Sequence, residues 1–320
     1  MVQPGDARHV PRSHDSPMTH DSPPESRRGD AYSIGDVAEM TGLSPDTIRV
    51  WERRYGRPMP VRLESGHRRY TSEHVRWLRR VAAALALGHR PSALMHLDET
   101  AISELLGPAP GARHEAPEVS RLLELAREFD GLQIRGVIHR GWTERGARDF
   151  LESVLMPALE RVGQAWADGT LDIRHEHFVS ELIQDELRGL RSLLPENPEG
   201  TPIVVATLSG EEHGLGIQVA ALIARLAGAR AWVLGVSVPN EEIAHAAAEV
   251  GARGVAIGVS LATGGFETDR RLAHLRDLLP QDVRLLVGGK GARGVRRGLR
   301  NVDYVEDLDS FEAWVRALPR

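Results

Sequence analysis

A histidine with an acidic neighbour lies at a position in the sequence that suits metal or cofactor binding. The pattern E-x-H-x-x-G runs from Glu211 through His213 to Gly216, directly after the apolar run 203–208. That run predicts a first parallel strand, and open sheets of parallel strands bind ligands outside the carboxyl ends of the strands. Glu211 can accept the second ring N–H of His213, the usual way of orienting a metal-bound imidazole. We expect His213 to ligate a metal or cofactor, although a lone surface histidine is more often only solvated.

Small and hydroxyl residues follow later apolar runs of the same region. After Pro202 five apolar segments alternate with helical patterns, at 203–208, 231–237, 254–260, 283–287 and 303–305. This alternation predicts a doubly wound, Rossmann-like α/β domain over residues 200–320. Ser260 and Thr263 come at the end of the third segment, and the pair Gly288-Gly289 ends the fourth.

These loops together resemble those of cobalamin-binding domains. The resemblance implies that His213 replaces the cofactor's own base as the lower ligand of cobalt. It also implies a slot beside the sheet for the nucleotide tail of the cofactor. The residues expected around that slot are Gly216, Ser260, Thr263, Gly288 and Gly289.

Residues 118–196 carry apolar side chains at helical spacing. The clearest stripe recurs at intervals of three and four, which places its members on one helix face. Its members are Leu151, Leu155, Leu159, Val162 and Trp166. Gly169 can end this helix and Asp172 can cap the next. The region predicts a four-helix bundle.

A second motif crosses the end of that helix. Trp166 is followed after nine residues by Glu176-His177. The spacing resembles that in the family of light-sensing cobalamin regulators called CarH or LitR, and implies that the bundle caps the upper face of adenosylcobalamin. The expected contacts to the adenosyl side come from Trp166, Ile173, Glu176 and His177. An indole supplies a flat apolar wall, and a carboxylate accepts hydrogen bonds from ribose hydroxyls.

One residue departs from that family. Its best-known members have a histidine after the motif tryptophan, and this histidine captures cobalt once light has expelled the adenosyl group. Here the residue is Ala167, which has no nitrogen to offer. His175 and His177 are the candidate substitutes. The sequence therefore leaves open whether light is the signal.

Residues 31–106 combine basic charge with a helix-turn-helix pattern. Positions 31–90 hold 11 arginines against 6 acidic residues, whereas the whole chain carries a net charge of −5. Such a basic segment is typical of a nucleic-acid-binding surface, although a basic face that contacts only solvent has the same composition. Ser33 with Asp36 predicts a capping box for a helix through Met40, and Ser44 with Pro45 predicts the start of a second helix. A third helix is expected through residue 87 and a fourth over 91–106.

Prolines and a glycine divide the next stretch into a small β-wing. Its elements R-Y-G-x-P-x-P-x-R and G-H-R-R-Y resemble the winged helix-turn-helix of MerR-family transcription regulators. The DNA contacts expected from this resemblance are Arg49, Trp51, Arg53 and Arg54 on the recognition helix, and Arg62, His67, Arg68, Arg69 and Tyr70 on the wing. Arginine suits both phosphate and guanine. Trp51 has a second interpretation, as a core residue packed on the third helix.

Length and composition limit the remaining possibilities. A chain of 320 residues predicts two or three domains, and the lack of cysteine excludes disulfides, thiol catalysis and thiolate metal sites. Residues 1–30 are poor in large apolar side chains and are expected to form a disordered tail, and 107–117 a linker rich in proline and glycine. No apolar run is long enough to span a membrane, and no signal peptide is evident. We expect a cytoplasmic protein.

The sequence as a whole predicts a transcription regulator, and not an enzyme. Adenosylcobalamin bound through His213 is expected to control a homo-oligomeric repressor, dimer or tetramer, on double-stranded operator DNA with inverted repeats. One alternative is a MerR-type regulator that senses the form of cobalamin, or another small ligand, without light. A corrinoid-dependent enzyme component is the other, but such proteins do not normally carry a winged helix.

Overall fold

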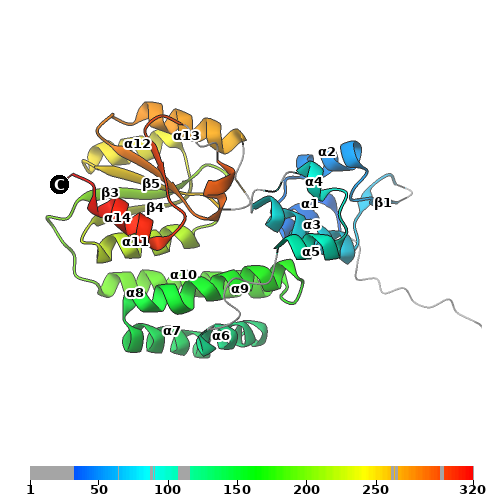
Figure 1. Cartoon of the computed structure of the whole chain (residues 1–320), viewed down its shortest axis with the longest axis horizontal. Helices are drawn as coiled ribbons and strands as arrows, with labels where there is room; N and C mark the ends of the chain where they lie inside the picture. Colours follow the sequence, from blue (N-terminus) through cyan, green and yellow to red (C-terminus); the bar gives the residue numbers. More distant parts are fainter. Residues whose placement is uncertain are drawn as a thin grey trace, which may run out of the picture.

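The computed structural model describes residues 32–63, 65–86, 89, 91–106, 116–260, 263, 266–295 and 299–319. The expected tail over 1–30 and positions 107–115 of the expected linker lie outside the described residues. The described chain forms a small helical domain with a two-stranded wing, then a helical bundle, then a parallel sheet flanked by helices (Figure 1). The predicted fold class is confirmed.

The first domain begins with two short capped helices. Its elements are α1 (Ile34–Thr41), α2 (Pro45–Tyr55), the antiparallel wing strands β1 (Val61–Arg62) and β2 (Arg68–Arg69), and α3 (Ser72–Ala86). Ser33 and Asp36 form the predicted capping box, and Ser44 caps α2 at Thr47. Both helices end at a glycine in the left-handed region, Gly42 and Gly56, where a side chain would be strained.

The single helix expected over 91–106 is two helices, α4 (Pro91–Leu94) and α5 (Glu99–Leu106). The carbonyl of Leu97 between them accepts hydrogen bonds from Arg57 Nη1 at 2.8 Å and Trp77 Nε1 at 3.2 Å. These long-range side-chain donors replace the helical partner of that carbonyl, and Asp98 then begins α5 by accepting from the Ala101 amide. Tertiary contacts therefore break what the local pattern predicts as continuous.

The second domain consists of four antiparallel helical segments. They are α6 (Pro117–Glu128), α7 (Gly131–Arg145), the composite α8 (Ala147–Phe150), η1 (Leu151–Leu155) and α9 (Met156–Ala167), and α10 (Ile173–Leu193). The η1 turn is π-helical and ends two residues before Pro157, which has no N–H to continue the ladder. Most of the predicted stripe is buried in the bundle core, whereas Trp166 at its end keeps exposed surface.

The third domain is a five-stranded parallel sheet in the order β4-β3-β5-β6-β7. The strands are β3 (Pro202–Leu208), β4 (Arg230–Val238), β5 (Gly254–Gly258), β6 (Arg284–Gly288) and β7 (Val302–Tyr304). The flanking helices are α11 (Leu215–Leu226), α12 (Asn240–Glu249), α13 (Phe266–Leu278) and α14 (Leu308–Arg316). The strand order reverses between β3 and β5, and their carboxyl ends therefore border the crevice where open α/β sheets bind ligands.

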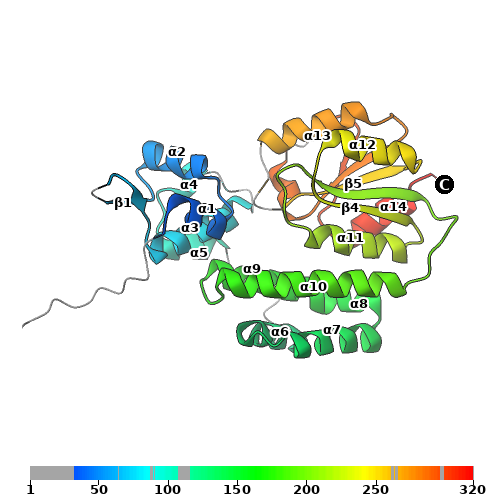
Figure 2. The ribbon, with the colours of Figure 1, turned by 180° about the vertical axis from the view of Figure 1, so that it is seen from behind.

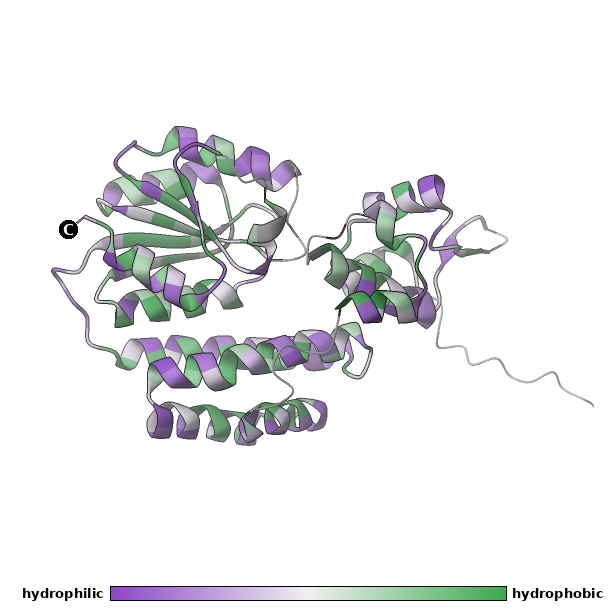
Figure 3. Cartoon of the chain, in the orientation of Figure 1, coloured by the Kyte–Doolittle hydropathy of each residue, from purple (hydrophilic) through white to green (hydrophobic). Residues whose placement is uncertain are grey.

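The sheet separates two apolar layers. α12 and α13 cover one face, and α11 and α14 cover the other, with the bundle stacked below them (Figures 1 and 2). The central strands are strongly hydrophobic (Figure 3) and almost wholly buried. No described helix is both long and apolar enough to cross a lipid bilayer.

The bundle and the sheet are joined by an arginine. The guanidinium of Arg148 on α8 pairs with Glu152 of the adjoining η1 turn and with Asp309 and Glu312 of α14. Elsewhere α10 packs along α11. On the side of the carboxyl ends of the strands, α3 of the first domain contacts α9 and the 3₁₀ turn η2 (Lys290–Gly294). The candidate DNA-binding domain therefore lies next to the edge of the sheet formed by the carboxyl ends of the strands (Figure 1).

Candidate cobalamin and DNA sites

The loop after β3 holds His213 in one orientation. Glu211 Oε1 accepts hydrogen bonds from the His213 amide at 2.9 Å and from the ring Nδ1 at 2.6 Å. Because a carboxylate only accepts, Nδ1 carries the proton and the lone pair is on Nε2. The imidazole is 62% exposed while Glu211 is only 4% exposed. A buried carboxylate thus aims an exposed ring whose free nitrogen is the one able to bind a metal.

The second oxygen of Glu211 joins this loop to the loop after β5. It accepts from the Ser260 amide at 2.7 Å and from the Thr263 hydroxyl. Burial raises the pKa of Glu211, but the hydrogen bonds from His213, Thr263 and Ser260 outweigh it and lower that pKa to about 2. Glu211 is therefore an anion at neutral pH, and it brings three other predicted residues together, His213, Ser260 and Thr263.

The bundle contributes charge to the same site. The hydrogen bond to Glu211 raises the pKa of His213, and the nearby negative charges of Glu211 and Glu176 add to this effect. Glu176 lies in the first turn of α10, where Ser180 donates to it at 2.6 Å. The histidine loop and the bundle carboxylate thus share one electrostatic environment between the two domains.

The other predicted bundle residues cluster where α9 ends and α10 begins. Trp166 and Ile173 are half-buried and His177 is exposed, whereas Ala167 is buried. His175 accepts the Asp172 amide at 3.1 Å through Nδ1 and packs its ring 4.8 Å from that of Phe129. His175 therefore serves the start of α10, which leaves His177 as the freer of the two candidate substitutes for the missing histidine.

The predicted glycines differ in the space around them. A Cβ on Gly216 would meet nothing within 4 Å, so open space lies beside the histidine loop. A Cβ on Gly289, which has a φ of 95°, would lie 2.6 Å from the Val259 carbonyl oxygen, and one on Gly291 only 1.9 Å from that of Ser260. The η2 segment therefore rests directly on the backbone after β5, and only glycine permits this approach.

The ligand that this site offers suits a metal ion that an organic macrocycle already coordinates. Within the described residues no group of three or more histidine, aspartate or glutamate side chains is arranged to hold a metal ion. A single oriented imidazole would instead supply one ligand to a metal that an organic ring already coordinates. The open space at Gly216, beside the switch point of the sheet, leaves room for a bulky organic group. These residues are therefore compatible with a corrinoid.

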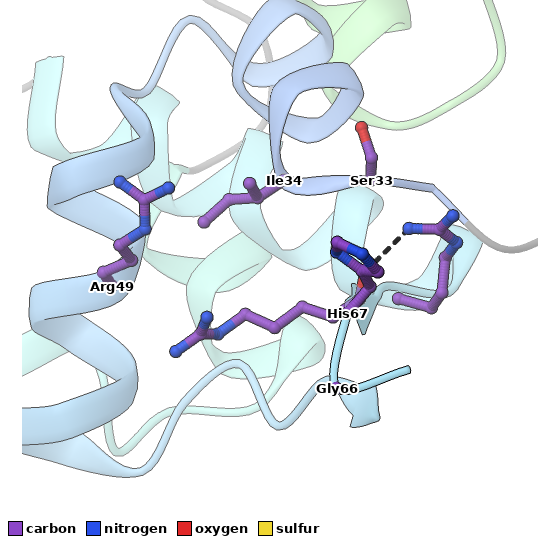
Figure 4. Close-up of a pocket in the computed structure, with 7 residues that line it drawn as sticks. Ser33, Ile34, Arg49, Gly66 and His67 are labelled. Atoms are coloured by element: carbon purple, nitrogen blue, oxygen red, sulfur yellow. Dashed lines mark hydrogen bonds between the residues drawn. The ribbon is translucent and has the colours of Figure 1, made fainter. Parts of the chain in front are cut away.

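The wing and α2 form a basic hollow in the first domain. It has a volume of about 190 Å³ and is lined by Ser33, Ile34, Arg49, Gly66, His67, Arg68 and Arg69. Figure 4 shows Arg49 on α2 facing the wing loop that carries His67. Arg53, Arg54 and Arg62 are exposed on the same two elements. This concentration of cations is suited to phosphate groups.

Two predicted DNA contacts are corrected by burial. Trp51 is 5% exposed and Tyr70 has no exposed surface, so neither side chain can reach DNA. Tyr70 donates to Glu52 Oε1, and Arg68 Nε donates to Glu52 Oε2 at 2.8 Å. Burial and the hydrogen bond to Glu52 raise the pKa of Tyr70. Both aromatic residues pack the core that positions the recognition helix, which is the second interpretation given for Trp51.

Two functional candidates have no motif of their own. Glu52 links α2 to the wing, and Arg79 of α3 is buried against Trp166 of the bundle. In the sequence, the only indication of a role for Glu52 is its negative charge within a basic helix. Nothing local distinguishes Arg79 from Arg76 and Arg80, because its partner is 87 positions away.

Comparison with known proteins identifies the families to which parts of the chain belong. A model of the MerR HTH family regulatory proteins matches residues 32–99, and models of the B12 binding domain match 118–189 and 201–313. The HTH-type transcriptional repressor CarH of Myxococcus xanthus is 30% identical over 273 residues, which cover 82% of this chain and 90% of CarH. The chain belongs to the CarH family of transcriptional repressors. The repressor CarA of the same organism is also 30% identical, over 81% of this chain and 87% of CarA.

Membership of this family identifies a cobalamin-binding transcriptional repressor rather than an enzyme, as the sequence predicted. The solved structure of the Methanosarcina barkeri monomethylamine corrinoid protein superposes with a TM-score of 0.50 at 15% identity. It covers 61% of this chain and 95% of that one. At this identity the likeness concerns the fold of the bundle and sheet alone.

Proposed function

We propose that this repressor responds to adenosylcobalamin and light, with His213 as the lower ligand of cobalt. The observation that carries the proposal is the oriented imidazole at the switch point, with Nδ1 tied to buried Glu211 and Glu176 of the bundle nearby. Trp166, Ile173, Glu176 and His177 would border the adenosyl side. Gly216, Ser260, Thr263, Gly288 and Gly289 would border the nucleotide tail. The proposed domains are residues 31–106 for DNA, 118–196 for the bundle and 200–320 for the cofactor.

The chain's own residues have separate tasks in this scheme. Glu211 keeps the proton on Nδ1, so the lone pair on Nε2 of His213 would be free to hold the metal of a bound cofactor. Glu176 offers carboxylate oxygens to ribose hydroxyls, and Trp166 offers a flat apolar wall. The cofactor supplies a cobalt–carbon bond that light cleaves.

On the DNA side, α2 and the wing would bind adjacent grooves and backbone. Exposed arginines would neutralise phosphates, and Arg49, exposed on α2, would enter the major groove with that helix. We propose a homo-oligomer on inverted repeats, because a two-fold symmetric pair of winged domains needs two symmetric half-sites. Regulation then requires that the DNA-competent assembly differ from the incompetent one in its affinity for the cofactor.

The test is a spectrum of the full chain with adenosylcobalamin, in the dark and after green light, together with retention on operator DNA. DNA duplexes would be selected from a random pool with the dark, cofactor-loaded protein. We expect light to change the spectrum and weaken DNA binding. His213→Ala should shift the dark spectrum and weaken cofactor retention, while His245→Ala on remote α12 changes neither. A spectrum and affinity unchanged by His213→Ala would rule out the ligand assignment.

A second function is favoured by Ala167, which has no ligating atom. The protein would then sense the form of cobalamin, and light would act only by converting one form into another. In that case illuminated protein should exchange its cofactor and regain DNA binding in the dark when fresh adenosylcobalamin is supplied. A stable product that resists exchange would instead favour a dedicated photoreceptor with a different histidine, His177 first, as its trap.

A further inference from the structure

The guanidinium of Arg79 joins the DNA-binding domain to the cofactor-capping bundle. Its Cζ lies 4.8 Å from the ring centroid of Trp166, and its Nη1 donates to the Trp166 carbonyl at 3.2 Å. Its Nε donates to the Met40 carbonyl at 3.2 Å. Met40 and Trp166 lie in the last turns of α1 and α9, where the partial negative charge of a helix end attracts a cation. One side chain thus joins the ends of helices from two domains.

This contact is deeply buried. Arg79 is 4% exposed, and the negative charge of Asp172 acts on it without a direct ion pair among the described residues. Burial accordingly lowers the pKa of Arg79. Removing a cation from water is costly unless other groups replace the lost hydration, and an aromatic face is worth most to a cation that is desolvated. The indole and the two carbonyls are those groups.

Other contacts hold the same junction together. Arg80 of α3 pairs with Asp168 just beyond α9 at 3.4 Å, and α3 also contacts η2. Lys290 of η2 pairs with Glu160 of α9 at 3.2 Å. α9, which carries Trp166 in its last turn, is therefore the helix at which the DNA-binding domain, the bundle and the sheet domain meet.

We infer that Arg79 is a positioning residue for the cobalamin site, holding one face of the Trp166 indole while the other face receives the adenosyl group. Trp166 is only half-buried despite its contact with Arg79. Because the guanidinium belongs to the DNA-binding domain, docking of that domain and binding of the adenosyl group stabilise each other. This inference rests on the proposed function, because it assigns a helper to Trp166 at the adenosyl side.

The role of Arg79 can be measured in two independent ways, because docking of the domain and binding of the ligand affect each other. If docking orders the indole for the ligand, the ligand must favour docking by the same factor. The first measurement needs no cofactor, and the second compares two forms of cobalamin that differ in the upper ligand. The chain also offers a matched control, because Arg57 stacks on Trp77 at 5.1 Å and donates to a carbonyl entirely within the first domain.

The first experiment measures hydrogen exchange of the full chain without cobalamin. Arg79→Ala should speed amide exchange at the end of α9 by about tenfold, whereas Arg57→Ala leaves that segment unchanged. Arg79→Lys keeps the positive charge but loses the planar guanidinium over the indole and one N–H donor. This variant should fold, and it should speed amide exchange at the end of α9 by less than Arg79→Ala does. Unchanged exchange at the end of α9 in both Arg79 variants would overturn the inference.

The second experiment measures affinity for adenosylcobalamin and for hydroxocobalamin in the dark. Arg79→Ala and Arg79→Lys should weaken the adenosyl form, the alanine variant by about tenfold, or about 1.4 kcal/mol, and change the hydroxo form less than twofold. A purely structural role would weaken both forms equally, and that outcome would overturn the inference. In the unmodified chain adenosylcobalamin should slow exchange at the end of α1, and faster exchange there would also overturn it.

The two proposals fail separately. If the unmodified chain binds neither form of cobalamin, the proposed function is wrong, and Arg79 is then only an interdomain contact. If it binds adenosylcobalamin through His213 and the Arg79 variants bind both forms as well as the unmodified chain does, the proposed function stands and the role of Arg79 is wrong.

Discussion

At the scale of single residues, the site depends on a buried anion. Glu211 accepts four hydrogen bonds from three residues and so connects two loops that carry the expected ligand and the expected slot. Its folded-state pKa of about 2 lies below the ordinary value of 4.5. Ionised Glu211 therefore stabilises the fold fully above about pH 4.5, and this contribution is lost as the pH falls toward 2.

We predict that Glu211→Gln lowers the melting temperature at pH 7, and that its difference from the unmodified chain shrinks at pH 3. The amide keeps one acceptor but places an N–H group against donors. Thermal unfolding at the two pH values measures the effect. Glu212→Gln, at the exposed neighbour, is the control and should show no such convergence. A difference independent of pH would contradict the role of the charge.

Ala167 allows a second prediction at this scale. Because its side chain is buried, Ala167→His should cost about 1–3 kcal/mol of stability through overpacking. If the ring reaches the cofactor, the illuminated protein should show the spectrum of cobalt held by two imidazoles. Ala167→Leu, which adds volume without a nitrogen, should destabilise the chain similarly and leave the light product unchanged. Identical spectra for the two variants would exclude position 167 as a ligand site.

At the scale of elements, the recognition helix and the wing act as one unit. Glu52 of α2 accepts from Tyr70 and from Arg68 at the end of the wing. The two DNA-reading elements are thus held in register by a carboxylate on an otherwise basic surface. Loss of the hydrogen bonds to Glu52 should weaken DNA binding, whereas loss of its negative charge should strengthen it.

We predict that Glu52→Gln weakens DNA binding although it removes a negative charge from the DNA-facing domain. Loss of charge alone would strengthen binding. Glu39→Gln, on the exposed face of α1, makes the same charge change without touching the wing and should leave affinity equal or slightly higher. Fluorescence anisotropy on one duplex measures both variants, and tighter binding by Glu52→Gln would refute the positioning role.

Two glycines beside the sheet should respond to alanine in opposite ways. Gly291→Ala places a Cβ against the Ser260 carbonyl, which is backbone and cannot move aside, so the chain should lose about 1–3 kcal/mol. Gly216→Ala in the first turn of α11 meets no neighbour and should gain up to about 1 kcal/mol. Gly216→Ala should nevertheless bind cobalamin more weakly, because the methyl group fills the proposed slot. Normal cobalamin affinity in this variant would contradict the slot.

At the scale of the whole molecule, charge is divided between a basic DNA-binding domain and an acidic remainder. Positions 31–90 carry an excess of arginine, although the net charge of the chain is −5. The acidic remainder should repel DNA, so attraction is confined to the surface of α2 and the wing. Non-specific binding by the other domains is therefore not expected.

We predict a steep salt dependence of DNA binding by the full chain. Arg49→Ala or Arg69→Ala should weaken binding and, where the lost contact is a phosphate, lower the slope of log affinity against log salt by about one. Arg270→Ala, on the exposed face of α13, is the control and should change neither quantity. Titrations at several salt concentrations measure the slope, and an affinity independent of salt would contradict the role given to the arginines.

The sequence by itself determined most of the elements and supplied the candidate residues of the sites. Caps such as Ser33 with Asp36, glycine helix ends and alternating apolar runs act over a few residues, so they were visible locally. The E-x-H-x-x-G loop was also local, and the contact of Glu211 with His213 followed from a spacing of two. Only the tertiary structure decided which residues are buried and which distant groups meet. It moved Trp51 and Tyr70 into the core, broke the helix after Leu94 and placed Arg79 on Trp166, because these outcomes depend on partners far away in the sequence.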